Sequence, residues 1–126
     1  MKQGRKPFVK FSVEWDKLKH PRFSTIRSWD ARKEEWYRSL IGHTVTMLKV
    51  QEGRPWAWSG RRKLGEATLL DVEVVVPRSL PSHIIETDIL RNGKPDEAWR
   101  TKLLAMDKAL MLTFERHSGL YAGEEA

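Results

Sequence analysis

The sequence contains no cysteine, which excludes disulfide bonds, thiolate nucleophiles and zinc sites built on cysteine. It has no uncharged stretch longer than Ser39–Leu48, whereas a membrane-spanning helix needs about 18 or more apolar residues. The glycine patterns of P-loop and dinucleotide-binding proteins are missing. The four histidines show no His-x-x-x-His spacing. We therefore expect no metal site, no cofactor and no association with a membrane.

The 126 residues suit one domain, and a content of 40% hydrophobic and 32% charged residues is typical of globular proteins. The first residues lead into alternating Phe and Lys, without the apolar region of a signal peptide. We expect a cytoplasmic protein with a basic N-terminal extension over residues 1–7, a domain over 8–116 and a flexible C-terminal tail over 117–126.

The charge is unevenly distributed along the chain. The sequence has 23 basic and 17 acidic side chains and a net charge of +6. Residues 1–63 hold 16 basic and 6 acidic side chains, a net charge of +10, and residues 64–126 hold 7 and 11, a net charge of −4. This asymmetry favours a cationic face and a polyanionic partner, nucleic acid first. The alternative is a solvated surface with a chance bias in charge.

The hydrophobic pattern predicts strands alternating with helices. Two aspartates, Asp30 and Asp96, stand at positions typical of a helix N-cap. The predicted strands cover residues 8–13, 23–27, 43–50, 64–76 and 110–116, and the predicted helices cover 31–40, 80–90 and a segment that begins at Asp96. Long central strands and a returning C-terminal strand favour an α+β fold, with a small, mostly antiparallel sheet or barrel and helices packed at its side.

Three segments carry a resemblance to a known family. They are Pro21–Arg27 (Pro-Arg-Phe-Ser-Thr-Ile-Arg), Leu64–Val72, and the final strand Leu110–Glu115 with its phenylalanine. Together they resemble the ASCH domain family of PUA-like β-barrels, whose motif is Gly-x-Lys-x-x-Thr-x-Arg. The similarity spans roughly residues 8–116. It implies a PUA-like barrel around a basic cleft, with RNA or nucleotide binding as the expected role. Some members of the family are hydrolases: an amidohydrolase acts on acetylcytidine, and others are described as ribonucleases.

The resemblance also implies catalytic residues, should the protein be an enzyme. Thr25 matches the catalytic threonine of the amidohydrolase motif, and Arg27 matches the final arginine. A carboxylate from the helix after the long strand completes the family's site. Asp88 falls near that position, and Glu86 is the alternative.

One departure from the motif bears directly on catalysis. Arg22 stands where the catalytic lysine would be, and His20 stands where the glycine would be. A threonine hydroxyl needs a base to accept its proton. Arginine stays charged above pH 12 or so and cannot be that base. The sequence therefore disfavours the lysine–threonine mechanism, although Lys19 or His20 could substitute.

The same segment is a candidate ligand-binding site. Lys19, Arg22 and Arg27 lie close together, and Thr25 and Arg27 share one face of an extended chain. In our leading hypothesis they bind a phosphate or a base edge in a cationic cleft. In the alternative, Arg27 forms an ion pair with an acidic residue of the long strand, Asp71 or Glu73.

A second candidate binding site is the loop before the long strand. Tryptophans next to cations can stack on unpaired bases while the cations contact phosphates. The alternative is an apolar lid folded onto the barrel. The residues concerned are Trp56, Trp58, Arg61, Arg62 and Lys63.

Two other tryptophans, Trp36 and Trp99, stand at helical spacing from leucines, and we expect both in the core. The sequence as a whole favours an RNA- or nucleotide-binding domain. The alternative is a hydrolase acting on a modified nucleoside or on RNA.

Overall fold

The computed structural model describes residues 7–117. Residues 1–6 of the expected N-terminal extension and residues 118–126 of the expected C-terminal tail lie outside this range.

Strands and short helices follow one another through the described residues. In chain order they are β1 (Phe8–Phe11), the 3-10 helix η1 (Asp16–Lys19), β2 (Arg22–Ser28), α1 (Ala31–Ser39), β3 (Thr44–Lys49), β4 (Arg62–Val75), the 3-10 helix η2 (Pro77–Ser79), α2 (Ser82–Asp88), β5 (Leu90–Arg91), β6 (Lys94–Pro95), α3 (Glu97–Leu104) and β7 (Ala109–Arg116). The predicted strands and helices are all present, with bounds that differ by a few residues, and η1, η2 and the short β5–β6 hairpin were not predicted.

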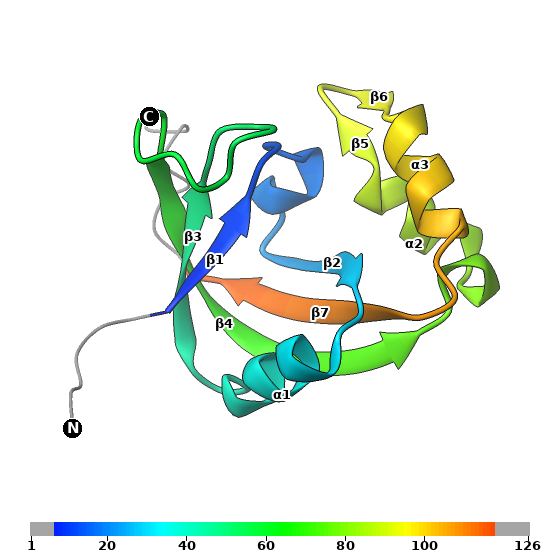
Figure 1. Ribbon diagram of the computed structural model, residues 1–126, viewed down its shortest axis with the longest axis horizontal. Helices are drawn as coiled ribbons and strands as arrows, with labels where there is room; N and C mark the ends of the chain where they lie inside the picture. Colours follow the sequence, from blue (N-terminus) through cyan, green and yellow to red (C-terminus); the bar gives the residue numbers. More distant parts are fainter. Residues whose placement is uncertain (1–6, 118–126) are drawn as a thin grey trace.

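The main sheet has the strand order β1-β3-β4-β7-β2 and curls into a half-barrel (Figure 1). β3, β4, β7 and β2 pair in antiparallel fashion, whereas β1 pairs with β3 in parallel. The predicted α+β class is therefore confirmed, and the sheet, expected to be mostly antiparallel, is a mixed one that forms a half-barrel. β2 lies at one edge of the sheet, where Thr25 is paired with Leu112 of β7.

The helices lie at two ends of the half-barrel. α1 lies next to β4 at one end, while α2, α3 and the β5–β6 hairpin form a separate layer beyond β2 and β7 (Figure 1). Both predicted N-caps are confirmed: Asp30 accepts from the backbone N–H groups of Arg32 and Lys33, and Asp96 accepts from that of Trp99. Within residues 7–117 no helix is long and apolar enough to cross a membrane.

Two clusters of buried side chains hold the fold together. The larger one fills the half-barrel and includes Phe23, Leu69 and Phe114. The smaller one joins α2 and α3 to the sheet through fully buried residues such as Ile89 and Leu103, each of which contributes roughly 1.5–3 kcal/mol by burial. This second cluster fixes α2 and α3 against β2 and so determines where their polar side chains lie.

Trp36 and Trp99 were both expected in the core, but the structure buries them to different extents. Trp36 is 43% exposed on α1, so its placement in the core was wrong. The reason is that α1 buries only Tyr37 and leaves its remaining faces polar or open. Trp99 is half-buried and packs against the smaller core cluster.

Candidate functional site

A lysine is buried at the centre of the molecule. Lys17 lies in η1, with only 1% of its surface exposed. Its Nζ donates a hydrogen bond to Thr25 Oγ1 on β2, at 3.0 Å, and forms an ion pair with Asp88. Thr25 and Asp88 are themselves buried. η1, β2 and α2 thus bring a primary amine, a hydroxyl and a carboxylate together in a site removed from bulk water.

Asp88, the last residue of α2, is held by donors from three directions. Its Oδ1 accepts from Lys17 and from the backbone N–H of Ile26, at 3.3 Å for the latter. Its Oδ2 accepts from Nε1 of Trp99 on α3, at 2.9 Å. A buried carboxylate is stable only when its oxygens are paired in this way. The arrangement fixes the Asp88 side chain, and through it the position of Lys17.

The environment of Lys17 lowers its pKa. Burial is the largest influence and lowers the pKa of Lys17 from its ordinary value of 10.5. The charge of Asp88 and its hydrogen bond act in the opposite direction, and the nearby charge of Arg27 lowers the pKa of Lys17 further. The net direction is downward, which makes Lys17 a better candidate for a general base than an ordinary surface lysine.

A cleft with a volume of about 520 Å³ reaches this cluster. The end of β1, residues 25–28 of β2, the start of the β3–β4 loop and one side of α3 line it. Thr25 is part of the lining, and so are Trp15 and Trp99, whose stacked rings have centroids 6.2 Å apart. The Trp15 ring lies 5.8 Å from Lys17 Nζ. The Thr25 hydroxyl therefore lies beside an aromatic wall.

Arg27 also lines the cleft, on the same strand as Thr25. Its guanidinium donates to the backbone carbonyl of Lys10 at 2.7 Å and to the Tyr37 hydroxyl at 3.5 Å, and it lies 4.8 Å from the centre of the Phe11 ring. Within residues 7–117 it forms no ion pair, so the alternative in which it pairs with Asp71 or Glu73 was wrong. The two hydrogen bonds leave part of its donor set available to a ligand.

Other predicted residues of the motif lie away from the cleft lining. The side chain of Arg22 is 66% exposed, and its nearest carboxylate is Glu115 at 3.9 Å. Lys19 and His20, the suggested substitutes for the catalytic lysine, are both exposed. The structure brings Lys17 to Thr25 in their place.

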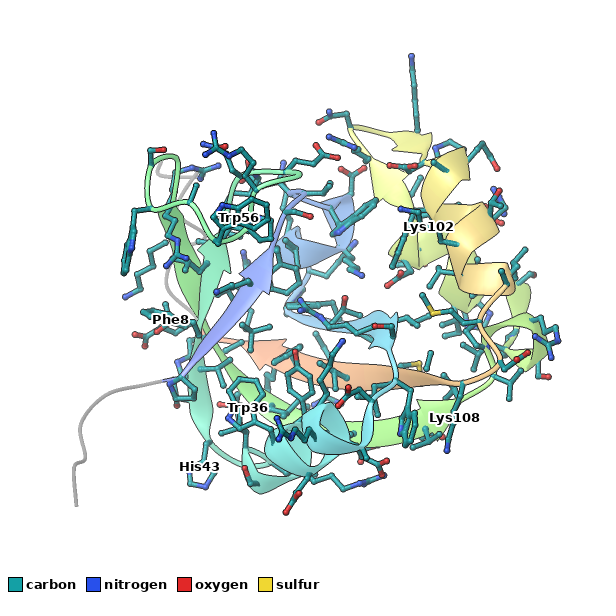
Figure 2. All side chains as sticks on the ribbon, in the orientation of Figure 1. Phe8, Trp36, His43, Trp56, Lys102 and Lys108 are labelled. Carbon is teal, nitrogen blue, oxygen red and sulfur yellow. The ribbon has the colours of Figure 1, made fainter. Side chains whose placement is uncertain are left out.

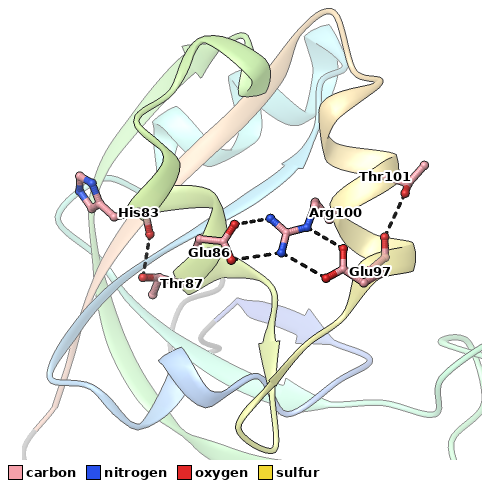
Figure 3. A network of polar contacts seen from close by, with 6 residues as sticks. All are labelled: His83, Glu86, Thr87, Glu97, Arg100 and Thr101. Carbon is pink, nitrogen blue, oxygen red and sulfur yellow. Dashed lines mark hydrogen bonds and ion pairs between the residues drawn. The ribbon is translucent and has the colours of Figure 1, made fainter.

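The alternative acid, Glu86, takes part in a different network (Figure 3). Its carboxylate pairs with Arg100 of α3, which also pairs with Glu97. The bond from Arg100 lowers the pKa of Glu86. The network is exposed and connects α2 to α3 on the outside of the helical layer. Of the two predicted acids, only Asp88 is therefore bonded to the lysine beside Thr25.

The aromatic loop between β3 and β4 does not form a lid. Trp56 is 65% exposed and Trp58 is 81% exposed, and Figure 2 shows Trp56 on this loop. Arg61 lies 4.4 Å from the Trp58 ring centre and donates to two carbonyls of the loop. Arg62 pairs with Glu14 at 2.6 Å, and Lys63 pairs with Glu66 at 3.3 Å.

Sequence reasoning missed Lys17 and the aromatic pair formed by Trp15 and Trp99. Lys17 belongs to a charged stretch that reads as a solvated surface, and its partner Asp88 is 71 positions away. One signal was present: Asp88 stands among Ile84, Ile85 and Ile89, and an acid on an apolar helix face needs a buried partner. The residue type that partners it, and where it comes from, depend on the tertiary structure.

Comparisons of the chain with protein-family models, with curated proteins and with solved structures found no match. In residues 7–117 no group of three or more His, Cys, Asp or Glu side chains is placed to hold a metal ion.

Proposed function

We propose that the protein is a hydrolase of the ASCH type, with a PUA-like half-barrel, that removes the acyl group from an acetylcytidine-type nucleoside. The observation that carries the proposal is the buried contact of Lys17 with Asp88 and with Thr25, which lines the cleft. The sequence motif lacked a lysine at the expected position, and Lys17 supplies one from η1. In this proposal Lys17 takes the part of the lysine that the motif lacks at Arg22.

The proposed reaction begins at the Thr25 hydroxyl. Neutral Lys17 accepts the hydroxyl proton across the 3.0 Å contact while Thr25 Oγ1 attacks the acetyl carbonyl carbon. The tetrahedral intermediate then collapses, the C–N bond breaks, and the Lys17 ammonium returns the proton to the departing amine. A water molecule hydrolyses the acetyl ester on Thr25, with Lys17 again accepting and returning a proton. The products are acetate and the free amine of cytidine.

Asp88 is a positioning residue in this scheme. Its carboxylate holds the Lys17 amine against Thr25 and stabilises the ammonium that forms during each proton transfer. The bonds from Trp99 and from the Ile26 backbone keep that carboxylate in place. Because the whole cluster is buried, these interactions act at a low effective dielectric and are stronger than they would be in water.

The aromatic wall supports a planar substrate. Trp15 and Trp99 are both half-buried and both line the cleft, and the centre of the Trp15 ring lies 5.8 Å from Lys17 Nζ. A nucleobase stacked on an aromatic side chain gains about 1–3 kcal/mol. Such stacking would hold a cytosine ring so that its acylated exocyclic amine faces Thr25.

The test is the release of acetate from N4-acetylcytidine by the purified full chain. We expect turnover by the wild type and its loss in Thr25→Ala, which removes the nucleophile and only a small buried side chain. Thr113→Ala, on the neighbouring strand β7 and outside the cleft lining, is the matched control and is expected to retain activity. A wild type without activity on acetylcytidine, or a fully active Thr25→Ala variant, would contradict the proposal.

RNA binding remains a second candidate function, supported by the two exposed tryptophans of the β3–β4 loop. Stacking of Arg61 on Trp58 gives this loop an ordered aromatic and cationic surface. Single-stranded RNA bound there should lose affinity with salt, by a log–log slope of about −0.7 for each phosphate contacted. Trp58→Ala should weaken the binding, and a salt-independent affinity would contradict an electrostatic interface. A cytoplasmic location fits both functions, because RNA and nucleotides are abundant there.

A further inference from the structure

We infer that the cleft binds a phosphate group of the substrate, so that a phosphorylated acetylcytidine is preferred over the free nucleoside. The reaction in this inference is that of the proposed function. The phosphate site is inferred from the charges that line the cleft. The phosphate could belong to a mononucleotide or to RNA, since both carry a phosphate attached to the nucleoside.

The cleft contains more available positive than negative charge. Its acidic lining residues are Glu52 and Asp96, and both pair with Arg91, at 2.9 Å and 3.3 Å. Arg91 itself is not part of the lining. The cationic lining residues are Lys10, Arg27, Lys33 and Lys102, and no carboxylate of residues 7–117 lies within ion-pair distance of any of them. Arg91 thus offsets one of the two negative charges, whereas the four cations of the lining have no carboxylate partner among the described residues.

These cations come from both walls of the cleft. Lys10 and Arg27 belong to β1 and β2, whereas Lys102 belongs to α3, on the side where Figure 2 labels it. Neither Lys10 nor Lys102 uses its side chain in a hydrogen bond within the described part of the chain, while Lys33 donates to Ser28 Oγ at 3.0 Å. An anion between the walls would meet donors from each of them. Phosphate fits this pattern because it has several acceptor oxygens and at least one full negative charge.

Arg27 is the most ordered of these cations, since Lys10, Phe11 and Tyr37 all hold its guanidinium. It is close enough to Lys17 for its charge to lower the pKa of that lysine. A phosphate bound at Arg27 would therefore lie near the reacting group, within the span of one nucleotide. Ordering before binding also reduces the entropy that Arg27 would lose on contacting a ligand.

The experiment compares kcat/KM for N4-acetylcytidine, for its 5′-monophosphate and for a short RNA containing one acetylcytidine. We expect at least a tenfold higher value for the phosphorylated substrates, and the better of the two identifies the source of the phosphate. Lys102→Gln should lower kcat/KM for these substrates about tenfold, the loss of one charge-assisted contact, and leave the free nucleoside unaffected. Lys94→Gln, an equally exposed lysine outside the lining, is the matched control and should change none of the three values.

Equal values for the nucleoside and both phosphorylated substrates would overturn the inference and leave the proposed hydrolase intact. If no substrate is hydrolysed, the proposed function fails, and binding then tests the phosphate site by itself. Calorimetry with cytidine and cytidine 5′-monophosphate should give tighter binding of the monophosphate, reduced by Lys102→Gln and not by Lys94→Gln. Equal affinities for the two ligands would overturn the inference in that case.

Discussion

Lys17 Nζ and Thr25 Oγ1 lie 3.0 Å apart, in a contact that also places the amine against Asp88. A buried ion pair contributes little net stability compared with apolar side chains of similar size, so a gain in stability alone does not account for a lysine at this position. Measurements of stability and of activity on variants of the pair distinguish a structural role from the proposed catalytic one.

The first prediction concerns the stability of the buried pair. Lys17→Met and Asp88→Asn should each destabilise the fold by about 3–5 kcal/mol, because each leaves the other partner unpaired in the core. The double variant should regain at least half of the summed loss, since no uncompensated charge remains. Urea unfolding of the four proteins measures this coupling. Losses that simply add in the double variant would show that the two side chains act independently.

The second prediction concerns how stability changes with pH. The folded-state pKa of Lys17 is lowered, so between that pKa and 10.5 the unfolded chain binds more protons than the folded one. The free energy of unfolding should therefore receive a contribution from Lys17 that increases as the pH rises through this window. The Lys17→Met/Asp88→Asn double variant should lack this contribution. Its curve of stability against pH should be flatter than that of the wild type, and identical slopes would count against a depressed pKa.

The third prediction concerns the pH dependence of activity. Because the reaction needs neutral Lys17, kcat/KM should rise with pH and level off above the pKa of that lysine. Arg27→Gln removes a positive charge that lowers the pKa of Lys17, so the midpoint of the rise should move to higher pH. Glu73→Gln removes an exposed charge outside the cleft and serves as the control, with an unchanged midpoint. A midpoint that stays fixed in Arg27→Gln would argue against Lys17 as the titrating group.

The fourth prediction distinguishes the two acids that the resemblance left open. Asp88→Asn should reduce kcat at least tenfold, because the amine loses the carboxylate that positions it beside Thr25. Glu86→Gln should leave kcat within about twofold of the wild type, since Glu86 is exposed and bonded to Arg100 (Figure 3). Steady-state kinetics on acetylcytidine provide the comparison. The reverse ranking would place the catalytic carboxylate at Glu86.

Much of the fold follows from local patterns. The caps at Asp30 and Asp96 and the long strand β4 were predictable because side-chain capping and hydrophobic periodicity act over a few residues. The exposure of Trp36 was not predictable, since residue spacing alone does not reveal which face of a helix packs against the sheet. The parallel pairing of β1 with β3 is likewise set by the path of the whole chain.

The site was predictable only in part, for the same reason. Thr25 and Arg27 lie on one strand, so their common face follows from the two-residue period of an extended chain. Lys17 lies in a 3-10 helix within a charged stretch, and such a stretch does not predict a buried residue. Its partner carboxylate lies 71 positions later in the chain. The match to the motif by position pointed to Arg22, which lies on the surface, whereas the residue that bonds to Thr25 is Lys17.

The most direct test of the account is the rate of acetylcytidine hydrolysis by the Lys17→Met/Asp88→Asn double variant, measured beside Arg22→Gln. Circular dichroism establishes that both variants are folded before their rates are compared. We predict that the double variant is inactive and that Arg22→Gln keeps the activity of the wild type, because Lys17 donates a hydrogen bond to Thr25 whereas Arg22 lies exposed near Glu115. A folded double variant that hydrolyses acetylcytidine at the wild-type rate would contradict the account.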